Sequence, residues 1–255
     1  MGNEMEHLFV GVDGCRAGWI VATIYENSLI NWEIFPSFKH IWSKFEEPPL
    51  QASRIFIDIP IGLVTKGSLP RLCDQQARKA LGRPRSSSIF SPPCRNALFA
   101  KDYAHANLIN RKYTKKGLSI QAWNISSKIL EINNFLHQNL LINRILWESH
   151  PEVCFWALNK KQRMIYNKKT KAGFIERKSL LVNFMEINDF FIEADLSFNK
   201  FSPQQAQKDD YLDAWVLALT ATGRGGVLRT FPDPPTFDDY NIPQRIAYLE
   251  VSEKI

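Results

Sequence analysis

Two short apolar segments that each end in aspartate constrain the fold of this 255-residue chain more than any other feature. They are LFVGVD, which ends at Asp13, and RIFID, which ends at Asp58. Between them lie two further β-like runs, GWIVATIY and LINWEIF, joined by a turn signal at 26–28, and then a helical pattern over 37–47. A helix in this position is the crossover that lets the second aspartate-ended strand pair parallel to the first. The sequence therefore predicts a mixed sheet in which both aspartates emerge at one edge, where open α/β sheets bind ligands.

The rest of the chain predicts helices and one more strand. The expected elements are helices at 71–82, 96–110, 121–140, 176–187 and 202–223 and a fifth strand at 142–147. A stretch rich in Pro, Ser and Arg at 83–95 favours irregular structure. We therefore expect one α/β domain over 1–255, with a five-stranded mixed sheet flanked by helices. It would carry a helical insertion at about 63–140, after the fourth strand, and a loosely ordered C-terminal tail at about 224–255.

Two more carboxylates lie near the start of the long helix expected at 202–223. Asp210 and Asp213 are spaced i, i+3, so their side chains can face the same way. Asp213 stands among apolar residues, and a buried carboxylate needs a partner or an ion. The neighbouring Asp209 is better explained as the N-cap of the helix.

Each acidic candidate also has a purely structural explanation. Asp13 and Asp58 follow strands, where aspartate is a common turn former. Asp210 is also explained as a first-turn charge that the helix dipole favours. Glu148, at the end of the fifth expected strand, is a further catalytic candidate, and an exposed strand-end charge explains it equally well.

Carboxylates gathered in a small volume cannot all stay ionised without cations, because like charges disfavour one another. Oxygen ligands alone suit Mg²⁺ or Mn²⁺ rather than Zn²⁺. Two such ions about 4 Å apart can activate a water and stabilise the leaving oxygen of a phosphodiester. We therefore expect Asp13, Asp58, Asp210 and Asp213 to be the metal ligands, and these four acids with Glu148 to form the catalytic set.

The positive charge of the chain is concentrated in two segments. The net charge is +6, but residues 71–116 hold 11 basic and 2 acidic side chains, and residues 159–178 hold 8 and 1. Such blocks are expected for a protein that binds a polyanion, and we expect a nucleic-acid partner. Solvated faces or mobile loops explain charge blocks equally well.

Several basic side chains are candidates for contacts with substrate phosphates. They are Arg16, Arg83, Arg85, Arg95, Lys168, Lys169, Lys171 and Arg177. A rigid, proline-pinned loop is an equally good explanation for the segment that contains Arg83, Arg85 and Arg95. His150, close to Glu148, is either a residue that orients an attacking water or a structural histidine.

The cysteines indicate a reducing compartment. The four Cys residues lie far apart and form no Cys-x-x-Cys pair, which indicates neither a zinc ribbon nor a disulfide framework. No apolar run approaches the about 18 residues that a bilayer-spanning helix needs, so no membrane association is expected. We expect a cytoplasmic protein.

A series of motifs resembles one known family. The motifs are GVDGCRAGW, IDIPIGL, RxCDxxARxxLG with SSSIFSPPCRNAL, GLSIQAW, ESHPEVCFWAL and DDYLDAWVLALTA, and they run from about Phe9 to Gly223. They are similar to those of the domain of unknown function family 429, described as predicted nucleases of ribonuclease H-like fold. The resemblance implies that fold, with the insertion after the fourth strand as a family feature.

The closing DxxDA helix also resembles that of Holliday junction resolvases in the same superfamily. In those enzymes a strand-one Asp, a strand-four acid and two helix carboxylates hold the metals, and the corresponding positions here are Asp13, Asp58, Asp210 and Asp213. The resemblance implies an Mg²⁺- or Mn²⁺-dependent nuclease acting on DNA or RNA, and resolvase-like action would require a homodimer. A non-catalytic protein that binds nucleic acid or metal is the main alternative. A phosphotransferase of the sugar kinase type would need two such domains.

Overall fold

The chain divides into two compact units, each built from separate stretches of sequence. The computed structural model describes residues 7–26, 28–67, 69–192 and 198–251. Of these, unit 1 comprises the residues within 1–58, 149–229 and 248–255, and unit 2 comprises those within 59–148 and 230–247. The sequence predicts one domain with an insertion. In the structure the insertion forms the larger part of a second compact unit.

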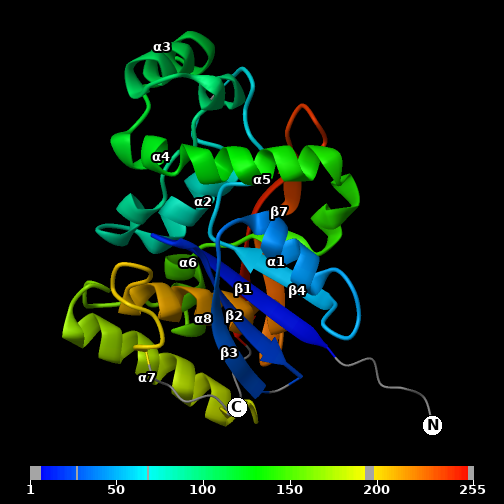
Figure 1. Cartoon of the computed structure of the whole chain (residues 1–255). Helices are drawn as coiled ribbons and strands as arrows, with labels where there is room; N and C mark the ends of the chain where they lie inside the picture. Colours follow the sequence, from blue (N-terminus) through cyan, green and yellow to red (C-terminus); the bar gives the residue numbers. More distant parts are fainter. Residues whose placement is uncertain (1–6, 27, 68, 193–197, 252–255) are drawn as a thin grey trace. The chain divides into compact units, whose positions relative to one another are not determined.

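A mixed sheet forms the centre of the fold (Figure 1). Its strands are β1 (Leu8–Cys15), β2 (Gly18–Tyr25), β3 (Ser28–Phe35), β4 (Ala52–Ile57), β5 (Leu146–Glu148) and β6 (Phe191–Ile192), in the order β5-β4-β1-β2-β3-β6. Strands β1, β2 and β3 form an antiparallel meander, and β4 pairs parallel to β1. The five predicted strands are therefore confirmed. The short β6 adds a sixth, parallel to β3, and the turn predicted at 26–28 includes Asn27, which lies outside the described residues.

Helix α8 (Lys208–Thr222) packs directly on β1, β2 and β4. Gly11 of β1 makes this close approach possible, because a Cβ there would lie 2.1 Å from the carbonyl oxygen of Ala214 and 2.2 Å from the amide nitrogen of Ala218. Only a residue without a side chain fits between the strand and the helix at this point. This packing fixes the position of α8 relative to β1. The contact on the strand, at Gly11, lies two residues before Asp13.

The helices of unit 1 differ at several ends from the sequence prediction. They are α1 (Phe38–Phe45), α6 (Pro151–Leu158), α7 (Lys171–Ile187) and α8. Helix α6 was not predicted, although Pro151 at its first position is a helix-start signal. Helix α7 begins before the predicted residue 176, because the Thr170 side chain accepts a hydrogen bond from the Gly173 amide and caps it there. The prediction that Asp209 caps α8 is wrong, because the N-cap is Gln207.

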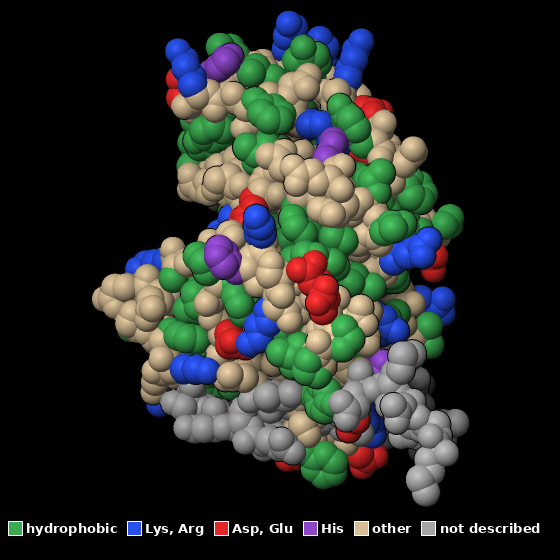
Figure 2. Space-filling model, turned by 45° about the vertical axis from the view of Figure 1, so that its right-hand side comes forward, with side chains coloured by type: hydrophobic (Ala, Val, Ile, Leu, Met, Phe, Trp, Pro, Cys, Tyr) green, Lys and Arg blue, Asp and Glu red, His purple; other side chains and the backbone are tan. Residues whose placement is uncertain are grey.

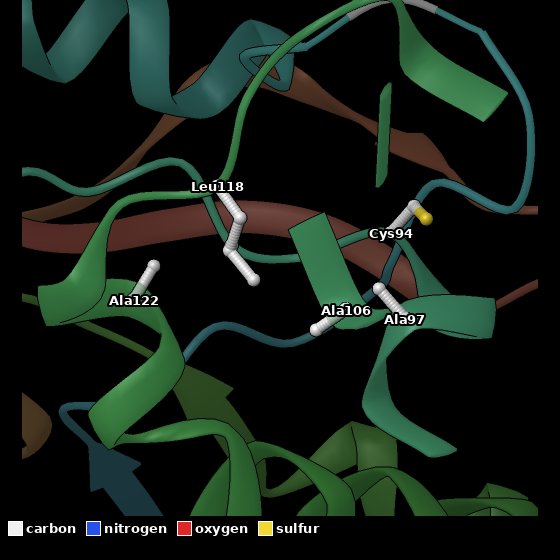
Figure 3. Packing of buried hydrophobic residues seen from close by; sticks show 5 residues of the cluster. All are labelled: Cys94, Ala97, Ala106, Leu118 and Ala122. Atoms are coloured by element: carbon white, nitrogen blue, oxygen red, sulfur yellow. The ribbon is translucent and has the colours of Figure 1, made fainter. Parts of the chain in front are cut away.

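Unit 2 contains the predicted helical insertion. Its helices are α2 (Leu72–Leu81), α3 (Tyr103–Thr114), α4 (Ile120–Asn124) and α5 (Ser126–Gln138), with 3-10 helices η1 (Arg85–Ser88), η2 (Arg95–Phe99) and η3 (Leu140–Arg144). Part of its core consists of one leucine and four small side chains, so the segments that carry the small ones can approach closely. These residues are Cys94, Ala97, Ala106, Leu118 and Ala122 (Figure 3). The strand predicted at 142–147 is shorter than expected, because η3 occupies the first half of that range.

The prediction of a loosely ordered C-terminal tail is wrong for its described part. Strands β7 (Gly226–Phe237) and β8 (Pro243–Val251) form a two-stranded sheet. The prolines of FPDPP count against a central strand, but β7 has a neighbour on one side only, and an edge strand tolerates residues without an N–H donor. The connection is held by the Asp238 carboxylate, which accepts hydrogen bonds from the amides of Tyr240 and Ile242.

Within the described part of the chain, we find no helix that combines the length and the apolar character needed to cross a membrane.

Candidate functional site

The two aspartates that end the first and fourth predicted strands lie on neighbouring parallel strands of unit 1. Asp13 is part of β1, its side chain is buried, and its Oδ1 accepts a hydrogen bond from the Gly14 amide at 2.8 Å. Asp58 follows β4 directly, and its amide donates to the carbonyl of Val12 at 2.9 Å. The parallel ladder between β1 and β4 thus continues as far as Asp58 and brings the two acids to the same edge.

The start of α8 supplies three further carboxylates. Asp213 is buried, with 3% of its side chain exposed, and Asp209 in the first turn is also buried. The Asp210 carboxylate accepts a hydrogen bond from the amide of Gln207 at 2.8 Å, so it forms part of the capping box of the helix. The structural explanation for Asp210 is therefore correct at least in part: its carboxylate holds the helix start.

A lysine that the sequence analysis assigned to substrate phosphates lies against this cluster. The Nζ of Lys168 is 2.5 Å from Oδ2 of Asp213 and 3.6 Å from Oδ2 of Asp209. Its side chain is 35% exposed, so the ion pair is accessible to solvent from the lysine side. Sequence reasoning did not predict this pair, because no sequence signal connects Lys168 to an aspartate 45 residues away.

The loop before α7 holds the backbone of Lys168 in place. The Asn167 carbonyl accepts hydrogen bonds from the amide and the hydroxyl of Thr170. Gly173 leaves room for this turn, since a Cβ there would lie 2.0 Å from the carbonyl oxygen of Asn167. The Glu176 carboxylate accepts from two further loop amides, at 165 and 166. The basic segment at 159–178 is thus fixed at its centre.

Burial and mutual repulsion raise the pKa values of the clustered carboxyls. Burial raises the pKa of Asp13 well above its usual range, and the charges of Asp213 and Asp58 raise it further, against the opposing effect of Lys168. The pKa of Asp213 is raised to about 6, mainly by burial, although Lys168 lowers it. Burial also raises the pKa values of Asp58 and Asp210. The cluster is therefore short of positive charge even with the lysine in place.

His150 and Cys154 lie near Asp58. The Ser149 amide donates to the carbonyl of Ile57, the last residue of β4, which places His150 beside the strand end. Its Nδ1 accepts from the Glu152 amide, as the N-cap of α6, and the imidazole lowers the pKa of Asp58. Burial raises the pKa of the Cys154 thiol to about 11, so this cysteine stays protonated and is a poor nucleophile.

Glu148 belongs to unit 2 and has different partners. It is buried, so its interpretation as an exposed strand-end charge is wrong. Its carboxylate accepts hydrogen bonds from the Ile61 amide at 2.7 Å and from the Arg71 guanidinium, which also binds Asp74. Burial raises the pKa of Glu148 to about 7, against the opposing effect of Arg71. Sequence reasoning missed Arg71 and Asp74 as partners, although both stand in the RxCD motif.

The basic candidates divide into exposed and buried residues. Arg16, in the turn between β1 and β2, and Lys169 and Lys171, at the start of α7, are exposed. Arg177 is 1% exposed and pairs with Glu152, so its guanidinium forms an ion pair in the interior of unit 1. The Arg95 guanidinium is buried in unit 2 and pairs with Asp238. For these two arginines the structure favours a structural role over the predicted phosphate contact.

The exposed basic residues of unit 2 gather at the end of α3. Arg111 and Lys112 form its last turn, and Lys115 and Lys116 follow, all exposed. Figure 2 shows Lys and Arg side chains at the top of the picture, the height at which α3 lies in Figure 1. Arg83 is exposed and Arg85 half-buried, beside and within η1.

The donor atoms of the cluster suit a hard cation, but the described residues are not arranged around one. No group of three or more His, Cys, Asp or Glu side chains among residues 7–26, 28–67, 69–192 and 198–251 is placed so that it could hold a metal ion. The donors of Asp13, Asp58 and Asp213 are carboxylate oxygens, as Mg²⁺ and Mn²⁺ prefer. The Lys168 ammonium already contacts one of these oxygens, Oδ2 of Asp213, and its charge acts on Asp13. By donor chemistry and by charge, these residues fit a divalent ion.

Fold and site together define an α/β protein with a mixed sheet and a buried carboxylate cluster at the edge shared by β1 and β4. The sequence profile described as "Protein of unknown function (DUF429)" matches residues 11–236, and the chain belongs to this family. The match confirms the resemblance found in the motifs. No curated protein and no solved structure matches the chain.

Proposed function

We propose that this protein is a metal-dependent nuclease that hydrolyses phosphodiester bonds of DNA or RNA. The observation that carries the proposal is the convergence of Asp13, Asp58 and Asp213, whose charges act on one another from two parallel strands and one helix. The strand order β3-β2-β1-β4-β5 with acids at these positions is the arrangement that a ribonuclease H-like fold implies.

The chain's own residues divide the work in this proposal. Asp13, Asp58 and Asp213 would hold Mg²⁺ or Mn²⁺, and such ions would stabilise charge on the phosphoryl oxygens. Asp210 fixes the start of α8 and so the position of Asp213. His150, beside Asp58, orients the attacking water. Glu148 is left out of this set, because its partners Arg71 and Ile61 belong to the interior of unit 2.

Exposed cations supply the contacts to the nucleic-acid backbone in our proposal. An acidic centre repels phosphates, so surrounding lysines and arginines must attract them. Lys169 and Lys171 flank the cluster in unit 1, and the residues at the end of α3 offer a second basic surface in unit 2. All four cysteines are free and buried, which supports a place for this activity in the reducing cytoplasm.

One observation favours a second candidate function. The ion pair between Lys168 and Asp213 neutralises part of the cluster without a metal. A protein that binds nucleic acid without cleaving it would keep such a pair. The two candidates differ in one measurement, the metal-dependent appearance of cleaved product.

The test is incubation with a panel of labelled DNA and RNA substrates, single-stranded, duplex and branched, in Mg²⁺ and in Mn²⁺. We expect cleavage by the wild type and loss of cleavage in Asp13→Asn, which keeps the shape of the side chain and removes a ligand charge. Asp239→Asn makes the same change at an exposed position of unit 2 and serves as the control. Binding without cleavage under every metal condition would select the non-catalytic candidate, and equal cleavage by Asp13→Asn would refute the proposed site.

A further inference from the structure

The Lys168 ammonium is the cation on which the electrostatics of the cluster depend. It is 2.5 Å from Asp213 and 3.6 Å from Asp209, and its charge also lowers the pKa values of Asp13, Asp58 and Asp210. The ammonium thus acts on five carboxylates, while His150 also lowers the pKa of Asp58 and Lys169 that of Asp210. Burial of the lysine works against its charged form, but attraction by Asp213 and Asp13 outweighs burial and raises its pKa.

The backbone of Lys168 is fixed, whereas its side chain can leave the cluster. The turn at 167–170 is closed by Thr170 and fits closely against Gly173. Lysine, however, has a flexible four-carbon stem, and 35% of this side chain is exposed, compared with 3% for Asp213. Rotation about side-chain bonds is therefore enough to move the ammonium into solvent, and no rearrangement of the loop is needed.

We propose that the Lys168 ammonium is the resident counter-cation of this cluster, and that a divalent cation binds in exchange for it. The inference rests on the proposed function in one respect: it takes the same carboxylates as the ligands of the metal. It also accounts for an observation that the nuclease proposal leaves unexplained, namely that the described acids are not arranged as a ready metal site. In the metal-free protein the ammonium occupies the carboxylate oxygens that a metal would need.

The consequence is competition between two cations for one set of oxygens. A divalent ion must displace the lysine, so part of its binding free energy is spent on breaking the ion pair with Asp213. Removing the lysine charge therefore strengthens metal binding. If Lys168 instead helped to hold the metal, its removal would weaken metal binding. The direction of the change in metal affinity therefore shows whether Lys168 competes with the metal or helps to bind it.

The experiment measures Mn²⁺ affinity by titration calorimetry of the full-length protein at constant pH and salt. Lys168→Met keeps the length of the stem and removes the charge, and we expect about tenfold tighter binding, within the range of about 5- to 150-fold typical of coupled sites. Lys168→Arg retains the charge and should bind Mn²⁺ much as the wild type does. Lys39→Met is the matched control, because it removes the charge of an exposed lysine on α1.

A second measurement uses the wild type and does not depend on whether a variant folds. Acetylation of lysine amines with a water-soluble reagent, followed by mass spectrometry of peptides, reports how accessible each ammonium is. We expect labelling of Lys168 to rise at saturating Mn²⁺ while labelling of Lys169 stays constant. Unchanged labelling of Lys168 with Mn²⁺ bound, or equal or weaker Mn²⁺ binding by Lys168→Met, would overturn the exchange.

These results are separable from the test of nuclease activity. Tighter Mn²⁺ binding by Lys168→Met, with no cleavage by either protein, supports the exchange and removes the nuclease proposal. Cleavage that needs Mn²⁺, with Lys168 still protected from acetylation, would refute the exchange of cations and would still support the nuclease proposal.

Discussion

Each unit buries carboxylates beside one basic side chain, but the two groups are built in opposite ways. In unit 2 the Arg71 guanidinium uses all five of its N–H donors, on Asp74, on Glu148 and on the carbonyl of Ile61. In unit 1 the Lys168 ammonium acts on five aspartates, with His150 also acting on Asp58 and Lys169 on Asp210, and it remains partly exposed. A buried charge is tolerated when it is paired and hydrogen-bonded, and the Arg71 network meets that condition.

This difference distinguishes a structural network from a site. The Arg71 network has no donor left for a ligand, so it holds unit 2 together. In the aspartate cluster, burial and then repulsion between the carboxylates raise the carboxyl pKa values, and Lys168 offsets this only in part. An unbalanced buried charge is costly to folding and is kept where a further cation completes it.

The largest expected effect is on the stability of unit 2. Arg71→Leu leaves Glu148 and Asp74 buried without their partner, and we expect a loss of about 3–5 kcal/mol in the free energy of unfolding. Urea unfolding followed by circular dichroism measures it. Lys79→Leu, at an exposed position of the same helix, is the control and should change stability by less than about 0.5 kcal/mol. An equal loss in both variants would contradict the structural role of the network.

In the cluster of unit 1, the main effect should fall on activity instead. Asp13→Asn is expected to lower the rate of cleavage by about 10²–10³, since it removes a charge that helps to hold the metal. The free energy of unfolding of the metal-free protein should stay the same or rise, because one of several repelling carboxylates has gone. Denaturant unfolding in a metal chelator measures the second effect. A strongly destabilised Asp13→Asn would mean that this cluster, like the Arg71 network, serves stability.

The pH dependence of stability should show the charge imbalance directly. The pKa of Asp213 is raised to about 6 in the folded protein, so between about pH 4 and pH 6 the folded state binds more protons than the unfolded state. Stability contributed by this group is therefore present at low pH and lost as pH rises through 6, by about 3 kcal/mol in total. Asp213→Asn should flatten the curve in this window. Glu148, whose pKa is about 7, titrates mostly above it and retains its own slope in the variant.

The smallest expected effect concerns the exposed lysines of the basic segment. Because Lys168 is paired in the cluster, the test of phosphate contacts is the double change of Lys169 and Lys171 to Ala. If each lysine neutralises one phosphate, the slope of log affinity against log salt should fall by about 1.8 for a duplex. Circular dichroism should show an unchanged fold, because both side chains are exposed. The same slope and affinity in the double variant would move the contact surface elsewhere, and the residues at the end of α3 are the next to test.

Local sequence patterns determined most of the sheet and the positions of its acids. The apolar runs that end in Asp13 and Asp58, with a helix between them, predicted the parallel pairing of β1 and β4. The i, i+3 spacing at the start of α8 predicted that helix carboxylates would join them. The prediction of the strands succeeded because period-2 patterns are properties of neighbouring residues, and crossover connections follow a strict rule.

Only the tertiary structure decided the partners of the charged side chains. The pair of Lys168 with Asp213 spans 45 residues and that of Arg71 with Glu148 spans 77, so no local pattern contains either. The same holds for the β7–β8 sheet. The prolines of β7 predict a break in the strand, but β7 pairs on one side only, so it tolerates residues without an N–H donor. Which cation meets which carboxylate depends on burial and on how separate elements pack. The acids could therefore be picked out from the sequence. The packing of the chain decided that the carboxylates around Arg71 are fully paired and those around Lys168 are not.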